Sequence, residues 1–296
     1  MNDTPDTLNH HFGAPGRIAF REGPGGIPVA ALIAPHGACE LSLLGGQVLS
    51  YRPRGFQDVL WLSPLAEFSE GKPIRGGIPI CWPWFGKAPA GLPSDAPNHG
   101  FARTARWRVI GSEQDTQTTA ITLELTDQDA THPAWPTPYR LTLTVTLGDC
   151  LTLDLQTRNL ADSAVIYGEA LHAYLRVADS RQITLYGLGE KPLVFTDDAA
   201  HDIVYPKTDP ILALWDPVME RILALAADDA SAVVVWHPAL AHALPDMPLE
   251  GPRHFLCVEP ANPHHTGGQI TLRPGEAHTL TLRLQATLPP TQKAQP

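Results

Sequence analysis

Cysteine is scarce in this sequence, and long apolar runs are absent from it. The four cysteines, Cys39, Cys81, Cys150 and Cys257, are widely scattered and form no Cys-x-x-Cys pair. Their spacing indicates neither a zinc site nor a disulfide framework, and it fits a reducing cytoplasm. No apolar run reaches the length of a membrane span, and residues 1–20 lack the pattern of a secretory signal. We therefore expect a cytoplasmic protein that does not bind membranes.

Positive charge is also in short supply. The 296 residues include 21 Lys and Arg against 31 Asp and Glu, which gives a formal net charge of −10. Because there is no basic run, nucleic acid is not an expected partner, and any anionic ligand must be held by local charge. Sixteen of the 21 basic residues are arginine, the side chain that binds phosphate or carboxylate through a planar fork of donors.

Several catalytic signatures are missing. The sequence has neither Gly-x-Gly-x-x-Gly nor a Walker lysine motif, so a nucleotide cofactor is not indicated. It has no Gly-x-Ser-x-Gly elbow, which leaves a serine hydrolase unsupported. His237 with His242, and His264 with His265, do not follow the His-Glu-x-x-His zinc spacing and are interpreted as loop histidines. We expect neither a cofactor nor a metal.

The dominant pattern is an alternation of apolar and polar residues with a period of two. It is strictest over residues 141–147 and 151–157, and Gly148-Asp149 lies between them where a tight hairpin turn is needed. Residues 118–126 and 279–284 alternate in the same way. Such strands have one face in a core and one in water. Shorter strands are predicted at 29–34, 39–43, 48–52, 107–110, 183–186, 232–236 and 255–259.

Long helical patterns are nearly absent, while 30 prolines and 24 glycines punctuate the strands. Many short strands with frequent turns predict an all-β fold, one large antiparallel β-sandwich. Because no linker or repeat divides the chain, we expect residues 16–286 to form a single domain. The polar ends, residues 1–15 and 287–296, are expected to be flexible tails.

The segment from Ile74 to Arg103 is apolar but irregular. It contains Ile-Arg-Gly-Gly-Ile-Pro-Ile-Cys-Trp-Pro-Trp-Phe-Gly and, after a Pro/Gly-rich spacer, Asn-His-Gly-Phe-Ala-Arg. Its prolines and glycines interrupt both helix and central strand. One interpretation is a pocket lining whose polar groups are Arg75, His99 and Arg103. The other is a packed loop whose arginines bond backbone carbonyls, and the composition alone favours neither.

Three more segments place a polar group in apolar company: His172 between Leu171 and Tyr174, Asp216 after Trp215, and Glu259 at the end of Phe-Leu-Cys-Val. A buried carboxylate needs a partner or a raised pKa. A carboxylate and an imidazole are the groups that general acid–base chemistry requires near neutral pH. Each residue alone is more often structural, a hydrogen-bonded core histidine or a strand-end anchor, and sequence spacing does not show that the segments meet.

Together these motifs resemble a known family. The matching segments are residues 59–63, 74–86, 98–103, 170–174, 234–238 and 257–260, in family order. They resemble the glucose-6-phosphate 1-epimerase (hexose-6-phosphate mutarotase) branch of the aldose 1-epimerase superfamily. The Arg-Gly-Gly, Trp-Pro-x-Phe-Gly and His-Gly-x-Ala-Arg combination is the most specific part. The resemblance implies a galactose mutarotase-like β-sandwich, which agrees with the alternation.

The resemblance also implies roles for residues of this sequence. Glu259 would be the catalytic base, His172 the catalytic acid and His99 a second active-site imidazole. The implied substrate contacts are Arg75, Asn98, Arg103 and Asp216, with the two arginines as phosphate ligands. The departures from the family pattern are Leu214, Pro217, His237, Ala261 and Asn262, and they bear on substrate preference.

The implied activity is a cofactor-free and metal-free interconversion of the α and β anomers of a hexose 6-phosphate, glucose 6-phosphate first, by a protein expected to be a monomer. Two alternatives stay open. One is an aldose 1-epimerase acting on an unphosphorylated sugar, and the other is a non-catalytic carbohydrate-binding sandwich.

Overall fold

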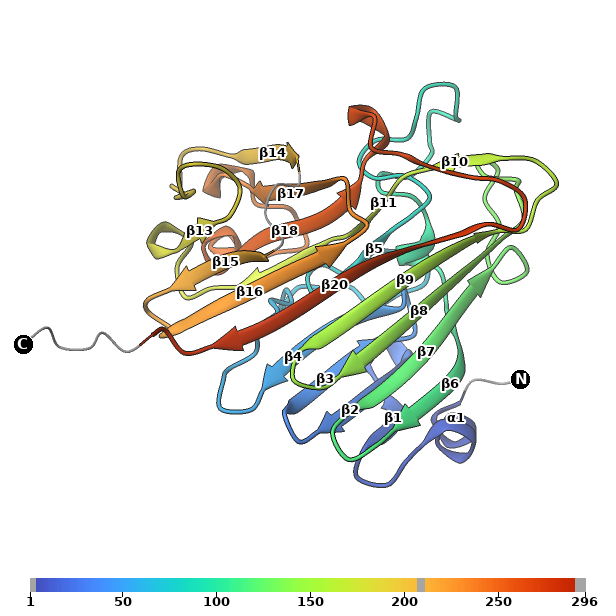
Figure 1. Ribbon diagram of the computed structural model, residues 1–296, viewed down its shortest axis with the longest axis horizontal. Helices are drawn as coiled ribbons and strands as arrows, with labels where there is room; N and C mark the ends of the chain where they lie inside the picture. The colour runs from blue at the N-terminus through green and yellow to red at the C-terminus, as the bar shows by residue number, and fades with distance from the viewer. Residues whose placement is uncertain (1–3, 207–210, 291–296) are drawn as a thin grey trace, which may run out of the picture.

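An eight-stranded antiparallel sheet forms the first layer of the protein. The computed structural model describes residues 4–206 and 211–290, and Figure 1 shows this sheet running across the front of the molecule. The strands follow the order β13, β15, β16, β20, β9, β8, β7 and β6. Their bounds are β13 (Thr184–Tyr186), β15 (Ile211–Asp216), β16 (Arg221–Asp228), β20 (Ala277–Thr287), β9 (Leu151–Asn159), β8 (Tyr139–Leu147), β7 (Thr119–Thr126) and β6 (Arg108–Gln114).

Two further sheets lie behind the first (Figure 1). A four-stranded sheet has the order β1 (Ile18–Glu22), β2 (Pro28–Ala34), β3 (Gly37–Ser42) and β4 (Gln47–Pro53). A six-stranded sheet has the order β14 (His201–Pro206), β17 (Ala232–His237), β18 (Phe255–Asn262), β11 (Glu169–Leu171) and β5 (Ile80–Cys81), and β12 (Ala173–Arg176) also pairs with β18. β10 (Val165–Tyr167) and β19 (Ile270–Leu272) form a two-stranded ribbon.

The alternation in the sequence explains the core between the layers. Along β8 every second residue is buried, because Leu141, Leu143, Val145 and Leu147 all point to one face. One continuous apolar cluster runs from Leu8 in the first helix to Ala286 in the last strand. The prediction of an all-β antiparallel sandwich is confirmed, and each predicted strand overlaps an observed one.

The N-terminal segment differs from the flexible tail expected there. Residues Pro5–Phe12 form the helix α1, which Thr4 caps through its side chain. Leu8 is buried in the main core, and the Asn9 side chain exchanges two hydrogen bonds with the backbone of Phe20, at 2.7 and 2.8 Å. One apolar residue and one amide therefore fix a segment whose composition is polar. Residues 1–3 and 291–296 of the two expected tails lie outside the described residues.

Within residues 4–206 and 211–290, six short 3-10 helices connect the strands: η1 (Pro24–Gly26), η2 (Ala102–Thr104), η3 (Ser180–Gln182), η4 (Leu240–His242), η5 (Gly251–His254) and η6 (His264–Thr266). Among the described residues there is no helix with the length and apolar character that crossing a membrane requires.

Candidate active site

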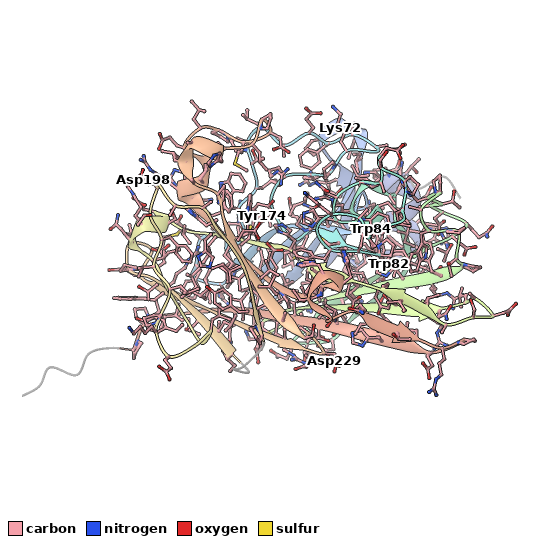
Figure 2. The ribbon with its side chains drawn as sticks, turned by 90° about the horizontal axis from the view of Figure 1, so that it is seen from above. Lys72, Trp82, Trp84, Tyr174, Asp198 and Asp229 are labelled. Atoms are coloured by element: carbon pink, nitrogen blue, oxygen red, sulfur yellow. The ribbon has the colours of Figure 1, made fainter. Side chains whose placement is uncertain are left out.

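Six of the seven predicted site residues line one cavity. It has a volume of about 320 Å³ and lies on the face of the six-stranded sheet that points away from the main core. Tyr174, which contributes to its wall, lies inside the molecule in Figure 2. The cavity is lined by Arg75, Phe85, Asn98, His99, Arg103, His172, Tyr174, Asp202, Val234, Trp236, Leu244 and Glu259.

The register of two strands brings His172 opposite Glu259. Ala170 pairs with Ala261 on one side and Ala173 with Val258 on the other. This antiparallel register places the two polar residues across from each other, with both side chains on the same face. The His172 Nε2 atom lies 3.3 Å from Glu259 Oε1, and the two side chains are 9% and 1% exposed. The predicted partial burial of Glu259 is thus nearly complete.

Burial sets the charge state of this pair. It raises the pKa of Glu259 well above its usual range, and the Asp202 carboxylate adds to the rise while Arg103 opposes it. Burial, together with the positive potential of His99, Arg103 and Arg75, lowers the pKa of His172 well below its usual range. Among the described residues, neither Glu259 oxygen has a hydrogen-bond partner, and the 3.3 Å contact lacks hydrogen-bond geometry. The pair is therefore most stable with both members neutral.

His99 presents one defined nitrogen to the cavity. The Gly86 N–H donates to His99 Nδ1 at 3.3 Å, so in the neutral ring the proton sits on Nε2. Burial and the charges of Arg103 and Arg75 lower the pKa of His99 to about 3. His99 itself has a φ of 62° and Gly100 a φ of 68°. A Cβ on Gly100 would lie 1.9 Å from the Trp82 carbonyl oxygen, which explains the glycine after this histidine.

The two arginines of the cavity differ in their partners. Arg75 Nε donates to both oxygens of Asp246 at 3.1 Å, and its Nη1 donates to the Tyr174 hydroxyl at 2.8 Å. Arg103 donates only to the Asn98 carbonyl, at 2.8 Å, and its buried Nε has no hydrogen-bond partner among the described residues. Burial lowers the pKa of Arg103. Of the two cavity arginines, Arg103 is therefore the one without a carboxylate partner among the described residues.

Asp216 is a correction to the sequence prediction, because it is not among the residues that line the cavity. It ends β15 fully buried, and its carboxylate accepts backbone N–H groups of Ala178, Val218 and Met219 at 2.9–3.1 Å. This is a turn anchor, and Pro217 belongs to the turn. The sequence alone does not distinguish an aspartate that anchors a turn from one that binds a sugar, because both can follow a tryptophan.

Asp202 is an acidic cavity residue that the sequence did not predict. It lies on β14, an edge strand that pairs with β17, and it lines the cavity near Glu259. The signal in the sequence is one acidic residue before Ile-Val-Tyr in a short run that was not recognised as a strand. Its partners come from strands distant in sequence.

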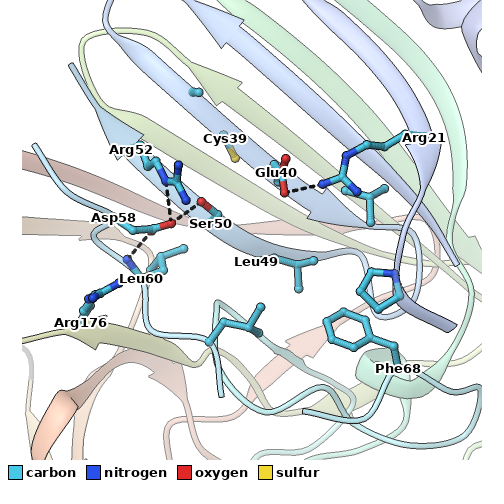
Figure 3. A pocket seen from close by; sticks show the side chains of 14 residues that line it. Arg21, Cys39, Glu40, Leu49, Ser50, Arg52, Asp58, Leu60, Phe68 and Arg176 are labelled. Atoms are coloured by element: carbon cyan, nitrogen blue, oxygen red, sulfur yellow. Dashed lines mark hydrogen bonds and ion pairs between the residues drawn. The ribbon is translucent and has the colours of Figure 1, made fainter. Parts of the chain in front are cut away.

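A larger cavity of about 440 Å³ lies against the four-stranded sheet (Figure 3). Two of its three arginines are paired, Arg21 with Glu40 at 2.8 Å and Arg52 with Asp58 at 3.4 Å, and the third is Arg176. No histidine lines it. The smaller cavity, with a carboxylate, two imidazoles and an unpaired arginine, is the better candidate for chemistry.

One group of potential metal ligands was found among residues 4–206 and 211–290: His172, Cys257 and Glu259, whose ligand atoms lie within 4.8 Å of one another. Cys257 precedes Glu259 by two residues on β18 and is buried. A metal site was not expected from the cysteine spacing, since two ligands come from β18 and the third, His172, from the residue between β11 and β12.

Comparison with known proteins identifies relatives of this chain. The sequence model of the family described as Aldose 1-epimerase matches residues 29–198 and 190–285. An Escherichia coli K12 protein named "Putative glucose-6-phosphate 1-epimerase" is 33% identical over 244 residues, covering 77% of this chain and 80% of that protein. A Salmonella typhimurium LT2 protein with the same name is 32% identical over 242 residues, covering 76% and 80%.

Solved structures show the same fold. A Salmonella typhimurium protein titled a "putative mutarotase" superposes with a TM-score of 0.81 at 27% identity, covering 92% of this chain and 94% of that one. The galactose 1-epimerase of Lactobacillus acidophilus superposes with a TM-score of 0.69 at 14% identity, covering 92% and 98%.

Proposed function

The chain belongs to the aldose 1-epimerase family, and we propose that the sugar whose anomers it interconverts is a hexose 6-phosphate, with glucose 6-phosphate the first candidate. The observation that carries this proposal is Arg103, a cavity guanidinium beside the Glu259–His172 pair without a carboxylate partner among the described residues. The names of the Escherichia coli and Salmonella relatives support the same substrate.

Glu259 and His172 divide the proton transfers of ring opening. Glu259 accepts the proton of the anomeric hydroxyl while His172 donates a proton to the ring oxygen, and the C1–O5 bond breaks to leave an aldehyde. Rotation about C1–C2 presents the other face of the aldehyde, and closure returns both protons. The step begins from a carboxylate and an imidazolium and ends with both groups neutral. Because burial favours the neutral pair at rest, the Glu259 proton must first move to His172 Nε2, 3.3 Å away, to form this charged pair. The two proton transfers with the sugar then restore the neutral forms, which favours ring opening from the charged pair.

His99 assists without changing its own charge. A pKa of about 3 keeps its ring neutral at physiological pH. With Nδ1 accepting from Gly86, its Nε2–H donates into the cavity and stabilises the developing charge on the sugar oxygen. Asp202 accepts hydrogen bonds from sugar hydroxyls and Asn98 donates to them, a role supported by their position in the cavity lining.

Arg103 and Arg75 bind the phosphate. Asp246 and Tyr174 take two of the N–H directions of Arg75, so three of its five donors remain for a ligand. In a protein with a net charge of −10, a dianionic sugar reaches the cavity only because of such local charge. An unphosphorylated sugar would leave Arg103 desolvated without a counter-charge, which disfavours that alternative.

A non-catalytic sugar-binding sandwich is disfavoured by the buried pair. A fully buried carboxylate without a hydrogen-bond donor is costly, and binding neutral hydroxyls does not require it. The proposal also includes a monomer in a reducing cytoplasm, supported by four free cysteine thiols, with no nucleic acid partner, supported by the acidic net charge.

Substitution of Arg103 tests the phosphate. A hydrogen bond to a charged group contributes about 1.5–3 kcal/mol, so Arg103→Ala should raise KM for glucose 6-phosphate by about 10- to 100-fold. The slow turnover of free glucose should hardly change. Arg106→Ala is the matched control, since Arg106 is a surface residue that pairs with Glu70. Equal losses on both sugars would mean that Arg103 holds the ring or the loop, and the phosphate assignment would fail.

A further inference from the structure

Cys257 lies beside the pair that carries the proposed chemistry, and that mechanism does not use it. It precedes Glu259 by two residues on β18, so the two side chains share a face of the strand. In register it pairs with Tyr174 on β12, two residues after His172. The Cys257 sulfur, a His172 ring nitrogen and a Glu259 oxygen all lie within 4.8 Å of one another.

These donors have unused bonding capacity. Both Glu259 oxygens are buried without a hydrogen-bond partner among the described residues, and His172 Nε2 lies 3.3 Å from one of them outside hydrogen-bond geometry. Cys257 is a free thiol. Buried polar atoms without partners indicate that the fold leaves them for a ligand. A sugar hydroxyl satisfies the carboxylate and the imidazole, but it makes no use of the sulfur.

The donor set matches a borderline-soft divalent cation. Zn²⁺ takes nitrogen, sulfur and oxygen ligands at about 2.0–2.3 Å in a tetrahedron, which separates neighbouring ligand atoms by about 3.3–3.6 Å. The imidazole Nε2 and the carboxylate are already 3.3 Å apart, and the sulfur has at most about 1 Å to move. Of the three ligands, His172 and Glu259 line the cavity and Cys257 does not, so the fourth position of the ion faces the cavity beside His172 and Glu259. A thiolate and a carboxylate together neutralise the ion, which offsets the repulsion from Arg75 and Arg103.

We propose that His172, Cys257 and Glu259 form an inhibitory Zn²⁺ site inside the sugar cavity. Zinc bound there occupies both groups that transfer protons, so it excludes the sugar and stops ring opening. The thiolate makes the site selective for Zn²⁺ or Cd²⁺ over Mg²⁺ and Ca²⁺, which prefer oxygen ligands. The inhibition rests on the proposed function, whereas the binding does not.

Metal titration of the intact protein tests the site without turnover. Zn²⁺ should bind with one-to-one stoichiometry by calorimetry, and Mg²⁺ should not. Co²⁺, used as a coloured substitute, should produce a thiolate-to-cobalt charge-transfer band that Zn²⁺ then displaces. Loss of a residue that only orients a metal ligand typically costs 10–100-fold in affinity, so Cys257→Ser should weaken zinc binding by at least about 100-fold. Cys150→Ser, which removes a thiol elsewhere, is the matched control.

Activity provides the second readout. Zn²⁺ should inhibit the wild type competitively with glucose 6-phosphate, while Cys257→Ser should keep the metal-free rate and resist zinc. Because Cys257 packs among Trp61, Tyr174 and Phe255, circular dichroism must show that the variant folds. If it does not, Glu259→Gln serves instead and should lose the cobalt band. A wild type without the band, or a folded variant that binds zinc as tightly as the wild type, overturns the site. Zinc binding to a protein that turns over no sugar leaves the site standing and rejects the proposed function.

Discussion

Glu259 is buried away from solvent and has no hydrogen-bond donor among the described residues. Its side chain is 1% exposed, and its neighbour His172 is itself held toward the neutral form by burial. Such a residue destabilises the folded state, because a buried ionised group without hydrogen bonds costs several kcal/mol. A catalytic role explains this cost, because the proposed chemistry requires a proton to move between Glu259 and the sugar.

His99 should make the protein sensitive to acid. Its pKa is about 3 when folded and 6.5 unperturbed, so between these values the unfolded chain binds a proton that the folded protein does not. Stability is then present above pH 6.5 and falls as the pH drops toward 3, by about 1.4 kcal/mol per pH unit from this residue. His99→Asn should reduce that slope. Asparagine tolerates the positive φ and accepts the Gly86 N–H.

Urea unfolding from pH 7 to pH 4 measures the effect. Glu259 contributes a slope of the opposite sign, since its pKa is raised, but it is present in both proteins and cancels in the comparison. His10→Asn, at an exposed position of α1, is the control. If the two variants show the same slope, His99 is not neutral in the folded protein.

Single residues were predictable where local context constrained them. Glu259 follows a continuous apolar run and His172 interrupts one, so both were found from the sequence and both line the cavity. Asp216 was placed wrongly, since a turn anchor and a ligand share the same neighbours in sequence. Asp202 was missed because only the pairing of β14 with β17 brings it to the cavity. That pairing depends on contacts distant in the chain.

At the scale of elements, the pairing of β11 with β18 sets the distance between His172 and Glu259. A buried polar cluster links these two strands. Glu169, fully buried on β11, pairs in register with Asn262 of β18 and accepts its amide at 3.3 Å. His278 of β20 lies 3.1 Å from the same carboxylate, which raises the pKa of His278. Glu169 precedes His172 by three residues, and Asn262 follows Glu259 by three.

Glu169→Gln should loosen this register. The glutamine fits the space but loses the ionic attraction to His278, so the protein should be destabilised by about 1–3 kcal/mol. A small displacement of His172 should lower kcat by about 10- to 100-fold with little change in KM. The double variant Glu169→Gln/His278→Gln should recover stability but not kcat, which a thermodynamic cycle measures. Normal kcat in the destabilised single variant would restrict Glu169 to a purely structural role.

The elements themselves were largely predictable because their periodicity is local. The hairpin at Gly148-Asp149 was predicted, and the structure pairs Leu147 with Leu151 across it. The helix α1 was not predicted, since eight residues with one buried leucine give no helical period. The order of strands within each sheet could not be predicted from the sequence, because neighbours such as β9 and β20 are separated by residues 160–276.

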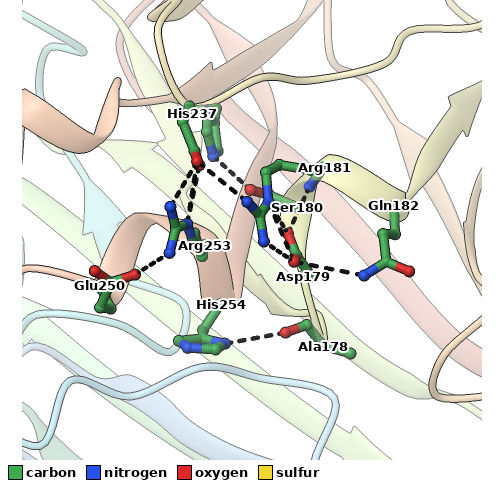
Figure 4. Close-up of polar contacts among 10 residues, drawn as sticks. Ala178, Asp179, Ser180, Arg181, Gln182, His237, Glu250, Arg253 and His254 are labelled. Carbon is green, nitrogen blue, oxygen red and sulfur yellow. Dashed lines mark hydrogen bonds and ion pairs between the residues drawn. The ribbon is translucent and has the colours of Figure 1, made fainter.

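At the scale of the whole molecule, ionic contacts tie distant loops to the start of β18. Arg253 of η5 bonds Asp197 at 2.7 and 3.1 Å, and Arg181 of η3 bonds Asp179 (Figure 4). His237, one of the departures from the family pattern, lies 3.0 Å from both the Ser180 hydroxyl and the Pro252 carbonyl. His237 ends β17 and is buried, so the prediction of a loop histidine is wrong, and its role is structural. These contacts, with one continuous core, support our proposal that residues 16–286 form a single domain.

At the scale of the whole molecule, the net charge bears on which sugar the protein binds. A net charge of −10 repels a sugar phosphate on average, whereas a neutral hexose meets no such barrier. If the phosphate is nevertheless the recognised group, local charge in the cavity must outweigh the field of the whole protein.

Anomer-exchange NMR on glucose 6-phosphate and glucose tests this directly. The rate of α–β exchange is measured for each sugar at equal concentration, above its own enzyme-free rate, with the wild type and with Glu259→Gln. The wild type should exchange glucose 6-phosphate much faster than glucose. Glu259→Gln should lose about 10²–10⁴-fold of that rate while melting at the same or a higher temperature. Equal wild-type exchange on both sugars, or a variant as fast as the wild type, would contradict the account.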